Sequence, residues 1–117
     1  MTISVCIAWT TPFDMAGDAY AAQDSRAVQA LEQALLSLRL SARPPREVVV
    51  AVVGDGRLRL PQASFPIRQI RLPEGTGPMA IRNTLAREAE GDLLLFLDPQ
   101  CLATTTMLDD YAAAAAR

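Results

Sequence analysis

The chain has 117 residues, half of them hydrophobic, and its 11 basic and 13 acidic residues give a formal net charge of −2 at pH 7. That length and balance predict one globular domain over residues 1–117 and argue against nucleic acid or an anionic membrane surface as a partner. No apolar run approaches the roughly 20 residues of a membrane span, and no signal-peptide pattern is present, so we expect a cytoplasmic protein.

Histidine and cysteine content narrows the chemistry. The sequence contains no histidine and 2 cysteines, which excludes a Ser-His-Asp triad and a histidine-based metal site within this chain. Cys6, inside an apolar run, and Cys101, after a predicted strand, are interpreted as small buried hydrophobic residues. Any acid–base or metal chemistry must therefore use carboxylates.

Short β-rich runs alternate with helix-period segments. Residues 3–9 form a β-branched apolar run that predicts a strand. After a polar loop over about residues 10–24, apolar side chains at three- and four-residue spacing predict an amphipathic helix over residues 25–40. Two prolines end that helix, and the wholly apolar run 47–53 then predicts a strand with both faces covered, as in parallel sheets flanked by helices.

The next elements are a weaker strand and a well-punctuated helix. The strand covers residues 66–72, and its first residue, a proline, indicates an edge position. Thr76 or Gly77 can cap the following helix, Pro78 suits its first turn, and Gly91 suits its C-terminal stop.

The last predicted elements are a strand over residues 92–97 and a helix from about Thr105. The strand is an unbroken apolar run that ends on Asp98, which we interpret as a parallel strand buried on both faces that delivers one polar group to a crevice. The whole order predicts an α/β fold: a Rossmann-like open, mostly parallel sheet of about four strands with helices on both faces.

Polar groups follow three of the predicted strands, and ligands of open α/β sheets bind at the carboxyl ends of strands. Thr10 follows the first strand, Asp55 the second and Asp98 the last. The two carboxylates suit ribose or base hydrogen bonds, or a hard cation such as Mg²⁺ or Mn²⁺. Arg82, near the start of a helix entered through a Gly-Pro loop, would meet a phosphate together with the helix dipole.

Each candidate has a purely structural alternative. Asp55 between glycines and Asp98 before proline are also ordinary turn residues. Arg82 also fits a solvated helix surface, and nothing local decides the place of Asn83. Trp9 fits the sheet core better than a stacking platform for a base.

The motifs together resemble those of a known enzyme family. The resemblance spans nearly the whole chain, and the combination of motifs over residues 71–101 is its most specific part. The matching segments are ISVCIAWTT, PPREVVVAVVGDG, IRLPEGTGPMAIRNTLAREAEGDLLLFLDPQC and LDDYAAA. They resemble the first half of a family 2 glycosyltransferase, the inverting group with the GT-A fold, and so imply a nucleotide-diphosphate sugar as donor.

The resemblance implies roles for individual residues. Arg82 and Asn83 match the Arg-Asn pair of the helix beside the nucleotide. Asp98 matches the first aspartate of the Asp-X-Asp motif, near the ribose and diphosphate. The implied donor-binding residues are Ala8, Trp9, Thr10, Asp55, Arg82, Asn83 and Asp98.

Two positions depart from the family pattern. Gly54 stands where the family has the aspartate that recognises the base, with Asp55 following it. Gln100 stands where the second aspartate of the motif commonly ligates a divalent metal. Asp98 and Gln100 are thus the candidate ligands of Mg²⁺ or Mn²⁺, and we expect lower affinity because the glutamine adds no negative charge.

The function expected from the resemblance is donor binding within an inverting glycosyl transfer enzyme. Its acceptor half and catalytic base find no match here, which leaves catalysis by these 117 residues open. The alternative is a non-catalytic scaffold or partner-binding module that kept the fold and lost the metal site. Exposed strand edges would favour self-association. A receiver-type phosphoacceptor is set aside, because the first predicted strand does not end in acids.

Overall fold

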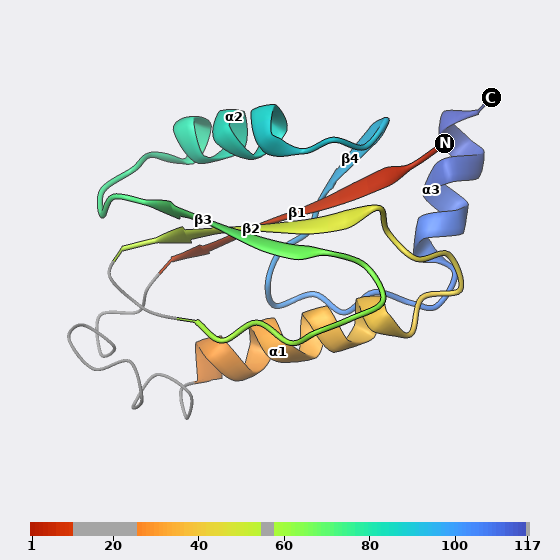
Figure 1. Ribbon diagram of the computed structural model, residues 1–117, viewed down its shortest axis with the longest axis horizontal. Helices are drawn as coiled ribbons and strands as arrows, with labels where there is room; N and C mark the ends of the chain where they lie inside the picture. Colours follow the sequence, from red (N-terminus) through yellow and green to blue (C-terminus); the bar gives the residue numbers. More distant parts are fainter. Residues whose placement is uncertain (11–25, 55–57, 117) are drawn as a thin grey trace.

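The fold is an open parallel sheet with helices packed on both faces (Figure 1). The computed structural model describes residues 1–10, 26–54 and 58–116. Its elements are β1 (Ile3–Thr10), α1 (Arg26–Arg39), β2 (Glu47–Val53), β3 (Ile67–Leu72), α2 (Pro78–Glu88), β4 (Leu93–Phe96) and α3 (Met107–Ala115). All pairings are parallel, in the order β3-β2-β1-β4. The predicted Rossmann-like α/β fold and the edge position of β3 are confirmed.

The strand order reverses its direction at β1. From β1 the chain adds β2 and β3 on one side, and α2 then carries it back across the sheet so that β4 pairs with the other side of β1. The carboxyl ends of β1 and β4 therefore flank a topological switch point, which is where open α/β sheets bind ligands.

The two faces of the sheet form separate cores because side chains alternate along each strand. On one face, Val5, Ile7 and Trp9 of β1 pack in a cluster that includes residues of α1 and α3. The stripe predicted for α1 is fully buried there, at Val28, Leu31, Leu35 and Leu38. On the other face α2 covers the sheet (Figure 1), through contacts of Cys6, Val49, Ala51, Val53, Ile81 and Leu85.

β4 is less buried than its apolar sequence predicts. Leu93, Leu94 and Leu95 are half-buried and Phe96 is 38% exposed, so the prediction of a strand buried on both faces is wrong. The reason is position, since β4 is the edge strand opposite β3 in the described sheet. Whether such an edge supports self-association stays a prediction.

Two smaller expectations are also wrong. Cys6 is buried as expected, but Cys101 is exposed because it lies in the loop after β4 rather than in the core.

Helix α2 ends at Glu88 with Ala89 as its C-cap, so Gly91 is not the helix stop. A Cβ on Gly91 would lie 2.6 Å from the backbone nitrogen of Ser4, which shows that glycine is needed there for close approach to β1.

A buried carboxylate ties the amino ends of the strands together on the α2 face. The Glu47 side chain is 4% exposed and accepts hydrogen bonds from Ser4 Oγ at 2.8 Å, from the Glu90 N–H at 2.6 Å and from Arg68 at 2.8 Å. The Gly91 N–H donates in turn to Ser4 Oγ at 2.8 Å. This cluster joins β1, β2, β3 and the segment between α2 and β4, and thereby fixes the C-terminal end of α2.

The Glu47 carboxylate makes stability depend on pH. Burial opposes its ionisation, but hydrogen bonds from Glu90, Arg68 and Ser4 outweigh burial and lower its pKa from the ordinary value of 4.5. Stability gained from the ionised form is therefore present above that value and is lost as the pH falls through the lower, folded-state pKa. We expect a lower urea midpoint at about pH 3 than at about pH 6.

A matched variant separates this carboxylate from the others. The pKa of Asp92 is also lowered, by hydrogen bonds from Thr2, so part of the decline belongs to it. Glu47→Gln should show a smaller decline than the parent chain over the same pH range. An equal decline in both proteins would contradict the assignment to Glu47.

Candidate functional site

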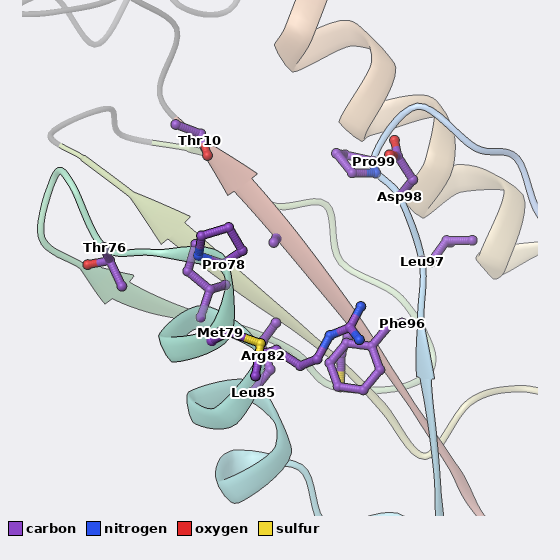
Figure 2. A pocket seen from close by; sticks show the side chains of 13 residues that line it. Thr10, Thr76, Pro78, Met79, Arg82, Leu85, Phe96, Leu97, Asp98 and Pro99 are labelled. Atoms are coloured by element: carbon purple, nitrogen blue, oxygen red, sulfur yellow. The ribbon is translucent and has the colours of Figure 1, made fainter.

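A cavity of about 560 Å³ opens at the switch point between β1, β4 and the N-terminal half of α2 (Figure 2). It lies on the same face as the Glu47 cluster but at the opposite, carboxyl end of the strands, with the apolar contacts of α2 between them. The described lining residues are Cys6, Ala8, Thr10, Thr76, Pro78, Met79, Ile81, Arg82, Leu85, Phe96, Leu97, Asp98 and Pro99.

The β1 wall of the cavity follows from strand alternation. Cys6, Ala8 and Thr10 line it in register, and Ala8 and Thr10 are exposed at the carboxyl end of β1. Trp9 points to the other face, where it is 2% exposed in the α1-side core. Its side chain is therefore sheet core, and a ligand in this cavity would meet Trp9 only through its backbone.

Arg82 and Phe96 face each other across the cavity. Figure 2 shows the Arg82 side chain reaching from α2 to the Phe96 ring on β4, and the guanidinium carbon lies 4.9 Å from the ring centroid. A guanidinium over an aromatic face is a favourable cation–π contact. Asn83, the next residue, is exposed on α2 and does not line the cavity.

Asp98 lines the cavity where the chain leaves β4. Its Oδ1 atom accepts a hydrogen bond of 2.8 Å from the Gln100 N–H, so the carboxylate also organises the turn at Pro99. The turn interpretation and the ligand interpretation of Asp98 are thus compatible. Gln100 is exposed and is not among the lining residues.

Cys6 forms part of the cavity floor. Burial, assisted by the negative charge of Glu47, raises the pKa of its thiol to about 11. The thiol is therefore protonated at neutral pH and contributes an apolar surface rather than a nucleophile.

The described residues do not form a divalent metal site by themselves. Across residues 1–10, 26–54 and 58–116, no three histidine, cysteine, aspartate or glutamate side chains gather closely enough to hold an ion. Asp98 is the carboxylate that this part of the chain brings to the cavity, whereas hard cations prefer several oxygen ligands. Asp55 lies outside the described residues. Metal ligation by Asp98 and Gln100 stays a prediction.

Sequence reasoning missed Phe96 as a cavity residue. Its position two residues before Asp98 was a usable signal, because residues two apart on a strand share a face. The packing of Leu93, Leu95 and Leu97 against the α1-side core leaves Phe96 facing α2. Phe96 lines the cavity only because α2 covers the same side of the sheet, and the sequence pattern does not say which side that is.

Fold and cavity together define a Rossmann-like α/β domain with a crevice at its switch point. No protein-family model matches the chain, and no curated protein does. Among solved structures it is similar to S. aureus TarS 1-349, with a TM-score of 0.60 and 21% sequence identity over 97% of this chain and 32% of the TarS chain. The likeness is one of fold, and the chain spans about a third of the length of that neighbour.

In the part of the chain that the structure describes, no helix is both long enough and apolar enough to cross a membrane.

Proposed function

We propose that this chain binds a nucleotide-diphosphate sugar as the donor-binding part of an inverting glycosyltransferase of family 2. The observation that carries the proposal is the cavity at the β1–β4 switch point, where Arg82 and Asp98 lie over an apolar floor. The motifs over residues 71–101, which resemble those of family 2 glycosyltransferases, support it, as does the likeness in fold to S. aureus TarS 1-349. The cavity volume of about 560 Å³ falls within the range of about 300–1,000 Å³ that is usual for small-ligand sites.

The charges in the cavity suit a nucleoside diphosphate. Arg82 offers a planar donor that pairs with phosphate oxygens in bidentate geometry. Asp98 offers carboxylate oxygens that accept hydrogen bonds from ribose hydroxyls. Ala8 and Thr10 line the same cavity at the end of β1, where the small side chain of Ala8 leaves room for the ligand.

Calorimetric titration with UDP and with GDP, each with and without Mn²⁺, tests the proposal. We expect at least one of them to bind, and we expect Asp98→Ala to weaken that binding by roughly tenfold or more, because a hydrogen bond to a charged group is lost. Asp110→Ala is the matched control, since Asp110 is an exposed carboxylate on α3 outside the cavity.

The metal arms distinguish how the diphosphate is held. Binding that strengthens with Mn²⁺ would support the predicted ligands Asp98 and Gln100. Equal binding without Mn²⁺ would assign charge compensation to Arg82. A folded chain that binds neither nucleotide at millimolar concentration would contradict donor binding and favour the non-catalytic scaffold.

A further inference from the structure

Phe96 is a large apolar side chain that the fold leaves exposed beside the cavity. It is 38% exposed, while Leu93 and Leu95 of the same strand pack against the α1-side core. Burial alone therefore does not account for an aromatic residue at this position. Its contact with Arg82 does give the ring a structural partner.

Arg82 differs from several other arginines in what holds it. Arg43, Arg46 and Arg68 each pair with a carboxylate at 2.8–3.2 Å. Arg82 forms no ion pair within residues 1–10, 26–54 and 58–116, and its guanidinium carbon lies 4.9 Å from the centroid of the Phe96 ring. An aromatic ring orients a guanidinium by stacking and, unlike a carboxylate, leaves its charge uncompensated for an anion.

The contact between Arg82 and Phe96 also joins α2 to β4 beside the cavity. Helix α2 packs mainly against β1 and β2, and Figure 2 shows the Arg82 side chain crossing from α2 to Phe96 on β4. Without the ring, the long arginine side chain would sample several rotamers, and binding would have to order it at an entropic cost.

We propose that Phe96 is a positioning residue that holds the Arg82 guanidinium over the cavity, directed at the diphosphate of a bound nucleotide. This inference rests on the proposed donor binding and deepens it. It assigns to the Arg82–Phe96 pair the preference for phosphate-bearing ligands over the corresponding nucleosides. The ring acts through Arg82 rather than by stacking on the base.

The test compares phosphate-bearing and phosphate-free probes by calorimetric titration. UDP and GDP are titrated alongside uridine and guanosine into the parent chain and into Phe96→Leu. We expect the variant to bind the diphosphates about three- to tenfold more weakly, which lies within the range of a cation–π contact converted to affinity, with nucleoside binding changed less than about twofold. Phe96→Trp, which keeps an aromatic face, should retain diphosphate binding.

A double-mutant cycle distinguishes a residue that positions Arg82 from one that only stabilises the fold. In an Arg82→Ala background, Phe96→Leu should cause no further loss of diphosphate binding beyond about twofold, because the ring acts through the missing guanidinium. Additive losses would overturn the inference. So would equal diphosphate affinity in Phe96→Leu and the parent, or equal weakening of nucleosides, which would indicate contact with the base.

The design separates misfolding of a variant from a loss of binding, and failure of the proposed donor binding from failure of this inference. Thermal unfolding of each variant checks its fold, and Phe96→Met, which keeps a flexible apolar side chain without a ring, replaces Phe96→Leu if the leucine variant does not fold. A parent chain that binds none of the four probes would overturn donor binding and this inference with it. A parent that binds UDP or GDP while the cycle is additive overturns this inference alone.

Discussion

Replacing Glu47 by glutamine is expected to lower the free energy of unfolding by about 2–4 kcal/mol at neutral pH. The glutamine side chain has nearly the same shape, but one end of it is an NH₂ group. That group must face either Arg68 or the donors Ser4 and Glu90, which places donor against donor in a nearly closed space. Arg68 is 39% exposed, so water compensates part of its charge and keeps the loss below that of a fully buried pair.

Urea denaturation at neutral pH measures this loss, and Glu32→Gln is its matched control. Glu32 is an exposed glutamate of α1, where a neutral replacement should change stability by less than about 0.5 kcal/mol. If Glu47→Gln were as stable as the Glu32→Gln control, the cluster would not stabilise the junction between α2 and β4.

Replacing Gly91 by alanine is expected to cost roughly 2–3 kcal/mol of stability, the scale of an overpacked core site. The added Cβ would lie 2.6 Å from both the backbone nitrogen and Oγ of Ser4, and 3.1 Å from the carbonyl carbon of Ile3. Two of these atoms are backbone of β1, so no side-chain rotation relieves the contact. The segment after α2 would have to move away and give up the 2.8 Å hydrogen bond from the Gly91 N–H.

Gly77→Ala is the matched control for this prediction. Gly77 caps α2 with φ −74° and has no atom within 4 Å of an added Cβ. Loss of cap preference and reduced freedom of the unfolded chain should leave its stability within about 1 kcal/mol of the parent. Thermal unfolding compares the two variants, and we expect a clearly lower midpoint for Gly91→Ala. Similar midpoints would show that β1 accommodates the added methyl group without a loss of stability.

The order and type of the elements could be predicted because they follow from local patterns. The wholly apolar run 47–53 and the helical spacing from Val28 to Leu38 each specify an element without knowledge of its partners. The cluster around Glu47 could not be predicted in this way. Ser4 lies 43 residues before Glu47 and 87 before Gly91, and no periodicity links such distant positions.

The residues that line the cavity were partly predictable. Ala8, Thr10, Arg82 and Asp98, all named from the sequence, line one cavity because parallel strands end at the same edge. Phe96 was missed because an unbroken apolar run does not reveal that its strand lies at an edge. Asn83 was grouped with Arg82 through the resemblance to the family's Arg-Asn pair. Neighbours on a helix point about 100° apart, however, and Asn83 is exposed outside the cavity.

The central place of β1 has a consequence for how the chain assembles during translation. The ribosome releases β1 before both of its neighbours, because β2 and β4 follow it after about 40 and 80 further residues. Pairing across such separations raises contact order and slows folding. The edge of β1 that pairs with β4 therefore stays unpaired until β4 has emerged. Association with other nascent chains competes during that interval, and a chaperone that shields early apolar segments would raise the yield of native protein.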